Sequence, residues 1–167
     1  GNTNTVVAFQ DQKDINSILV EIPNITSSPG VIPTAVWFED PSKILKIGTS
    51  ALKMRESSNS NSFFHSNFKR LIANPIEKFN QDKILNPTEC GEKFFKLLLA
   101  SIPEKYKINR LVLTAPIDTY RGYREWLVNL CGHISVDEIA LVDEPTAASL
   151  GINLPFGSKI MTLDIGG

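Results

Sequence analysis

Two glycine-bearing segments of this chain have residue types suited to phosphate chemistry. Gly1-Asn2-Thr3-Asn4 precedes an apolar strand pattern, and Asp164-Ile165-Gly166-Gly167 follows another. A glycine beside short polar residues can turn tightly and direct backbone N–H groups and hydroxyls at one anion. An aspartate at such a turn can hold a metal-bound water. Taken singly, each segment is explained as well by an ordinary polar turn.

Glu144 and the pair Lys69-Arg70 are the charged residues that could complete such a site. Glu144 stands between a strand pattern and a helix pattern, where ligands bind in open α/β sheets, and could orient water as a general base. A carboxylate that stabilises the helix N-terminus is the simpler interpretation. Lys69 or Arg70 could face a phosphate, but solvated side chains are again simpler. The pattern GxxxxGK[ST] is absent, so a nucleotide site must be of another type.

Composition restricts the classes of partner. The chain has 17 basic and 18 acidic residues and a net charge of −1, which calls for neither nucleic acid nor an anionic membrane. No apolar run approaches the ~20 residues of a membrane helix, and no basic stretch followed by an apolar core suggests a signal peptide. Two isolated cysteines, Cys90 and Cys131, fit a reducing compartment. We therefore expect a cytoplasmic protein.

The elements that must position these residues alternate between strands and helices. Residues 5–10 and 17–22 predict a hairpin, and Pro33 suggests a bend in a third strand over 31–39. A short strand over 43–47 leads to a helix over 51–55 capped by Thr49 or Ser50, and Asn86-Pro87 begins a helix that ends before Pro103. The second part predicts strands over 108–115, 138–142 and 160–163, a helix from Asp118 or Thr119 to Cys131, and a short helix from Pro145 to Leu150. Helices between apolar strands favour parallel pairing there.

In their order along the chain, five motifs resemble the nucleotide-binding domain of DnaK-type heat-shock chaperones. Gly1-Asn2-Thr3-Asn4 resembles the tail of the family's first phosphate loop, and Lys69-Arg70-Leu71-Ile72 matches its Lys-Arg-Leu-Ile motif. Pro116 ends a strand, and Arg124 follows eight residues later, as the family's arginine does. The remaining two motifs are Asp143-Glu144-Pro145-Thr146-Ala147-Ala148 and Asp164-Ile165-Gly166-Gly167.

The resemblance implies an α/β fold: an actin-like ATPase (ribonuclease H-like) lobe with a mixed five-stranded sheet, helices and a small α+β insert. Residues 1–35 and 108–167 would form the core subdomain, and residues 36–107 the inserted upper subdomain. Both ends look like cuts through a fold. We therefore expect the isolated chain to hydrolyse ATP barely or not at all.

The resemblance also implies roles for individual residues. Gly1, Asn2, Thr3 and Asn4 would contact phosphate and the Mg²⁺ shell, together with Gly166 and Gly167. Lys69 would reach the terminal phosphate, Glu144 would orient water or act as base, and Asp164 would hold the magnesium through its water shell. Pro116 and Arg124 would form a switch.

The cofactors implied are ATP or ADP and Mg²⁺. The partners implied are unfolded client polypeptides, bound through a further domain, together with J-domain and nucleotide-exchange co-chaperones.

Two alternatives remain open from the sequence. One is a sugar-type kinase of the same actin-like superfamily, although no clear candidate for its catalytic aspartate is present. The other is a divergent nucleotide-sensing or scaffolding relative that assembles in a nucleotide-dependent way. The motif Glu144-Pro145-Thr146, together with Lys69-Arg70-Leu71-Ile72, favours the chaperone interpretation over the kinase. Nucleotide-dependent assembly, seen by light scattering, would indicate the scaffolding relative.

Overall fold

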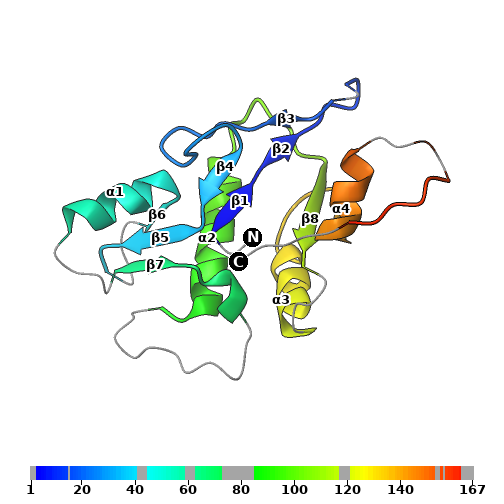
Figure 1. Cartoon of the computed structure of the whole chain (residues 1–167). Helices are drawn as coiled ribbons and strands as arrows, with labels where there is room; N and C mark the ends of the chain where they lie inside the picture. The colour runs from blue at the N-terminus through cyan, green and yellow to red at the C-terminus, as the bar shows by residue number, and fades with distance from the viewer. Residues whose placement is uncertain are drawn as a thin grey trace. The chain divides into compact units, whose positions relative to one another are not determined.

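Nine strands, four α-helices and one 3₁₀ helix form in the described part of the chain (Figure 1). The computed structural model describes residues 3–14, 16–40, 45–58, 63–72, 85–116, 121–152, 155 and 157–162. The chain divides into two compact units, Gly1–Tyr106 and Lys107–Gly167. The structure is therefore of the mixed α/β class, built from small sheets.

The first unit begins with two short antiparallel ladders. Strand β1 (Asn4–Val6) pairs with β4 (Val31–Pro33), and β2 (Ala8–Phe9) pairs with β3 (Ile18–Leu19). The second ladder is the predicted hairpin. Backbone bonds from the Val7 amide to the Gly30 oxygen (2.9 Å) and from the Val20 amide to the Val7 oxygen (3.0 Å) link the two ladders.

A three-stranded antiparallel sheet follows in the same unit. Its central strand, β5 (Ala35–Phe38), has all four residues buried and lies between β6 (Leu45–Ile47) and β7 (Phe64–Ser66). The predicted third strand is thus divided at Thr34, one residue after the proline. One side of the core is the cluster of Ala35, Trp37, Ala51 and Phe64.

Helix α1 (Thr49–Ser57) starts at Gly48, which is its N-cap and has φ 62°. The predicted cap from Thr49 or Ser50 is wrong, because no side chain caps this helix. The two hydroxyls instead donate to backbone oxygens of a distant turn, Thr49 to Ile25 (3.1 Å) and Ser50 to Asn24 (2.6 Å).

Helix α2 (Pro87–Ser101) starts where the sequence predicts. The Asn86 side chain accepts from the Glu89 amide (2.9 Å), and Glu89 accepts from the Asn86 amide (2.9 Å), which completes a capping box. The buried face of the helix includes Phe94, whose ring packs edge-on against Phe68 at 6.0 Å.

The second unit contains a parallel two-stranded sheet, as predicted. Strand β8 (Arg110–Ala115) and β9 (Glu138–Asp143) pair over six residues, and α3 (Arg121–Cys131) lies between them in the chain. Helix α4 (Glu144–Gly151) follows β9 directly and contacts both strands. The strands therefore end together, with Ala115 opposite Asp143.

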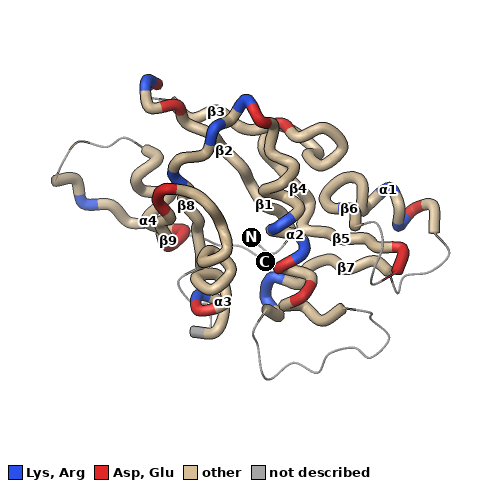
Figure 2. The backbone as a smooth tube through the Cα atoms, turned by 180° about the vertical axis from the view of Figure 1, so that it is seen from behind, with Lys and Arg blue, Asp and Glu red and all other residues tan. Residues whose placement is uncertain are grey.

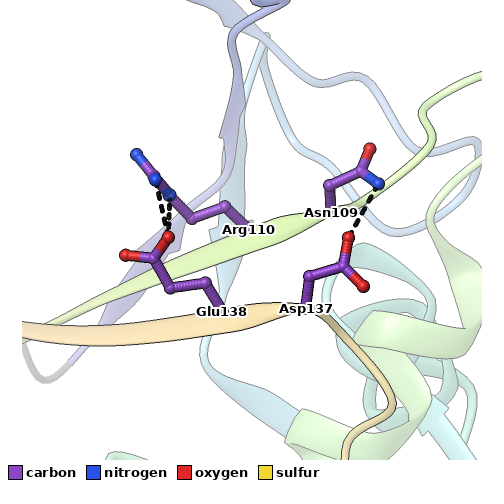
Figure 3. A network of polar contacts seen from close by, with 4 residues as sticks. All are labelled: Asn109, Arg110, Asp137 and Glu138. Atoms are coloured by element: carbon purple, nitrogen blue, oxygen red, sulfur yellow. Dashed lines mark hydrogen bonds and ion pairs between the residues drawn. The ribbon is translucent and has the colours of Figure 1, made fainter.

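Polar contacts at the opposite end of this sheet support its register (Figure 3). Arg110 bonds Glu138 Oε2 through Nε at 2.7 Å and forms an ion pair with it at 2.6 Å. Asn109 Nδ2 donates to Asp137 Oδ2 at 3.1 Å. Each contact joins residues that lie opposite one another in the two paired segments. A shift of the β8–β9 register by one residue would therefore break both contacts.

Some expectations differ from the structure. Strand β8 is not buried throughout, because its residues alternate between exposed and half-buried before the buried Ala115. The described residues 160–162 form no strand. Nor do the described strands form one five-stranded sheet, since they pair in ladders of two, two, three and two. The predicted division into residues 1–35 with 108–167, and 36–107, stays a prediction.

Candidate functional site

The backbone of residues 3–5, hereafter segment 3–5, is held by an antiparallel ladder. The Thr34 amide donates to the Thr3 oxygen at 2.8 Å, and Asn4 lies opposite Pro33. Hydrogen-bonded and non-bonded pairs alternate in such a ladder, so the Asn4–Pro33 pair is a non-bonded one. A proline fits there because its missing N–H is not needed, and the Asn4 carbonyl points away from β4.

Lys69 binds that carbonyl on the edge of β1 that faces away from β4. Its Nζ donates to the Asn4 oxygen at 2.9 Å, although the two residues are 65 positions apart in the sequence. The lysine opens the 3₁₀ helix Lys69–Leu71, which lies between two buried residues, Phe68 (3% exposed) and Ile72 (2% exposed). These apolar anchors position the ammonium at the start of β1.

The chemistry of this junction suits an anion. An ammonium has three N–H donors, and here one of them is directed at Asn4. Thr3 and Asn4 are exposed, and Lys69 is half-buried. Figure 2 shows that acidic and basic residues are otherwise interspersed along the chain, without a long block of one sign. The attraction for an anion is therefore local to this lysine.

Asp143 and Glu144 lie where β9 passes into α4. Asp143 is the N-cap, and its Oδ1 accepts from the Thr146 amide at 2.9 Å. Hydrogen bonds from Thr146, from its side chain first and then its amide, lower the pKa of Asp143, and nearby Arg124 adds to the effect. Asp143 is the side-chain cap, and Glu144 lies in the first turn of α4, where its carboxylate can stabilise the helix N-terminus as the simpler interpretation expects.

Tyr123 of α3 is a residue that the sequence analysis missed. Burial, and secondly the charge of Glu144, raise the pKa of Tyr123 to about 12. Its ring lies 5.4 Å from that of Trp126, one helical turn further on. The i, i+3 spacing of two aromatic residues was the available signal for a packed face.

The structure brings only some of the predicted site residues together. Asn4 and Lys69 are in contact, whereas Glu144 belongs to the second unit. Pro116 follows β8 and Arg124 lies on α3, both exposed. Gly1, Asn2, Asp164, Gly166 and Gly167 lie outside the described residues. Within the described ranges, no three His, Cys, Asp or Glu residues are grouped as metal ligands.

Two further findings concern the expected compartment. Cys90 and Cys131 are both buried and form no disulfide, and burial raises the pKa of the Cys131 thiol. Of the helices in the described ranges, none has the length and apolar character needed to cross a bilayer.

Comparison with known proteins adds no assignment. No protein-family model matches the chain, and no curated protein matches it. The case for a function therefore depends on the chain's own motifs and on the contacts described above.

Proposed function

We propose that this chain is part of the ATP-binding domain of a DnaK-type chaperone, with an actin-like ATPase fold. In this proposal the parent protein is a cytoplasmic ATPase that couples ATP binding and hydrolysis to protein folding. The five ordered motifs support the assignment, and so does the mixed α/β class with a parallel second unit.

The observation that carries the proposal is the contact between Lys69 and Asn4. The family resemblance assigns both residues to the phosphates, on the basis of motifs 65 positions apart. Nothing in local sequence requires the ammonium of one to meet the backbone of the other. The bond of 2.9 Å from Lys69 Nζ to the Asn4 oxygen brings the ammonium next to the segment that the resemblance also assigns to the phosphates.

The residues present fit a nucleotide phosphate as donors. Lys69 would neutralise charge on the terminal phosphate, while hydroxyl and backbone groups of residues 1–4 would orient it. Asp164 would hold magnesium through water, with Gly166 and Gly167 allowing close approach of backbone. Magnesium bound with ATP or ADP would supply further neutralisation of phosphate charge.

Glu144 is proposed to orient the attacking water. Its place after a parallel strand is typical of ligand-binding residues. Asp143 caps α4, and Glu144 lies in its first turn, so the proposal gives the glutamate a role in addition to stabilising the helix N-terminus. Pro116 and Arg124 would report the bound nucleotide to a peptide-binding domain, and J-domain and nucleotide-exchange co-chaperones would act on the cycle.

The test is steady-state ATP hydrolysis by the parent protein with its second lobe. We expect Lys69→Ala and Glu144→Gln each to lower kcat by about 100-fold or more, because positioning and charge neutralisation supply most of the catalysis. Lys96→Ala and Glu125→Gln, which change exposed residues on α2 and α3, are the matched controls and should leave kcat unchanged.

The outcomes separate the candidate functions. Loss in both site variants but in neither control supports the ATPase proposal. ATP consumption that requires a small-molecule acceptor, with transfer of the terminal phosphoryl group to that acceptor and release of ADP, would instead indicate the sugar-type kinase. If the parent protein binds ATP without turnover, it is a nucleotide sensor; if it does not bind ATP, the proposal is wrong.

A further inference from the structure

We propose that Thr34 is the positioning residue that sets the backbone of segment 3–5, and with it the Asn4 carbonyl that Lys69 contacts. The inference rests on the function proposed above and assigns a role to a residue outside the recognised motifs. Thr34 would touch no ligand; it would act through Thr3 and Thr5.

Thr34 bonds the residues on both sides of Asn4. Its amide donates to the Thr3 oxygen at 2.8 Å, and its Oγ1 lies 3.2 Å from Thr5 Oγ1. The hydroxyl pair is diagonal across the ladder, because Thr5 is directly opposite Ile32. Thr34, the residue that follows β4, therefore holds segment 3–5 through both its backbone amide and its hydroxyl.

The burial of Thr34 makes its hydroxyl unusual. The residue is 2% exposed, and Ile32 (0%) and Ala35 (1%) of the adjoining strands are buried as well. A valine would fill nearly the same space without the cost of burying a hydroxyl. The Thr34 hydroxyl is paired with the Thr5 hydroxyl. The polar atom is thus directed at segment 3–5.

Lys69 and Thr34 hold this segment from opposite sides. Thr34 binds the edge of β1 that faces β4, and Lys69 binds the Asn4 carbonyl on the other edge. If the Thr34 bonds loosen, β1 is held less tightly just before Thr5, and the Asn4 carbonyl would shift relative to the ammonium. Alignment of Lys69 with a phosphate would then be lost without any change to the lysine itself.

The experiment compares Thr34→Val with Thr34→Ser in the parent protein with its second lobe. One measurement is hydrogen exchange of the amide at position 34 without nucleotide; the other is affinity for Mg²⁺-ADP by calorimetry. Removal of one hydrogen bond predicts about fivefold faster exchange and about fivefold weaker binding for Thr34→Val. Thr34→Ser keeps the hydroxyl and should keep both values within about twofold of the original.

Thr49→Val is the matched control for a general loss of stability. It also removes a threonine hydroxyl bond, to Ile25 at 3.1 Å, in the same unit but away from segment 3–5. We expect it to leave ADP affinity unchanged. Thr5→Val removes the other half of the hydroxyl pair, and should reproduce the Thr34→Val effect without adding to it in the double variant.

Distinct results would overturn the two proposals. Equal ADP affinity in the original parent protein and in Thr34→Val, or equal loss in Thr49→Val, overturns the role of Thr34. If the original parent protein with its second lobe binds no Mg²⁺-ADP, the proposed function fails, and the exchange measurement alone decides whether Thr34 sets the segment. If the amide at position 34 exchanges at an unchanged rate in Thr34→Val, the claim that Thr34 sets segment 3–5 is also overturned.

Discussion

Replacing Gly48 by alanine should strongly destabilise the first unit. Gly48 has φ 62° and ψ −136°, a conformation that residues with a side chain rarely adopt. A Cβ at this position would lie 2.2 Å from the backbone oxygen of Ile25. Because that atom belongs to the main chain, no side-chain rotation can relieve the overlap.

The expected loss of unfolding free energy is about 3–5 kcal/mol. Backbone strain at such a position contributes roughly 1–3 kcal/mol. Moving the turn away would also weaken the bonds from the Thr49 amide to Ile25 (3.0 Å) and from the Ser50 amide to Asn24 (3.0 Å), each worth about 1 kcal/mol. Small domains have only about 5–15 kcal/mol in total, so much of the unit's stability would be lost.

Urea unfolding followed by tryptophan fluorescence measures this loss. The chain has two tryptophans, and Trp37 is the one in the first unit. It is 5% exposed and packs in one cluster with Ala51 of α1, the helix that begins at Gly48. A Trp126→Phe background therefore gives a signal from the affected unit only.

Gly30→Ala is the control with a similar positive φ but a smaller overlap. Gly30 has φ 71°, and a Cβ there would lie 2.8 Å from Leu19 Cδ2, 2.9 Å from Leu19 Cβ and 3.0 Å from the Val7 backbone oxygen. Because none of these contacts is as close as the 2.2 Å at Gly48, we expect a loss of only about 1–3 kcal/mol. A Gly48→Ala loss no larger than that of Gly30→Ala would refute the reasoning.

Three further predictions test the local interactions. Asn86→Ala should lower the unfolding free energy by about 1 kcal/mol, measured by thermal circular dichroism, because it removes the cap of α2; an unchanged melting curve would contradict this. The folded state raises the pKa of Tyr123 from 10.0 to about 12, so the free energy of unfolding should be intact below pH 10 and fall as the pH rises toward 12. Urea midpoints taken across this range measure the fall. Tyr123→Phe should abolish the part of it that comes from this tyrosine. A double-mutant cycle on Arg110 and Glu138 should give a coupling below about 1 kcal/mol that shrinks with salt, since both side chains are mostly exposed; a coupling above about 2 kcal/mol would be inconsistent with that exposure.

Elements with local signals were predictable from the sequence. The start of α2 is specified by Asn86, Pro87 and Glu89 within four residues, so nothing distant can alter it easily. The parallel pairing of β8 with β9 followed from a helix placed between two apolar strands.

Features that depend on distant partners were not predictable from local sequence. The hydroxyls of Thr49 and Ser50 have the residue type of a cap, but a turn 24 to 26 positions away competes for them. The apolar residues of β8 suggested a buried strand, yet Val112 is 53% exposed. A sequence pattern alone does not show which faces of a sheet are covered by other elements. The Lys69–Asn4 contact was not predicted, because the family resemblance assigned both residues to the phosphates but implied no bond between them.

That contact also sets an order of events during synthesis. Asn4 leaves the ribosome 65 residues before Lys69, which at about 5–20 residues per second is a delay of roughly 3–13 s. The β1–β4 ladder needs only about 30 residues and can form earlier, since short loops close at lower entropic cost. The Lys69–Asn4 contact is therefore formed late, so nascent chains should acquire it only after most of the first unit has emerged.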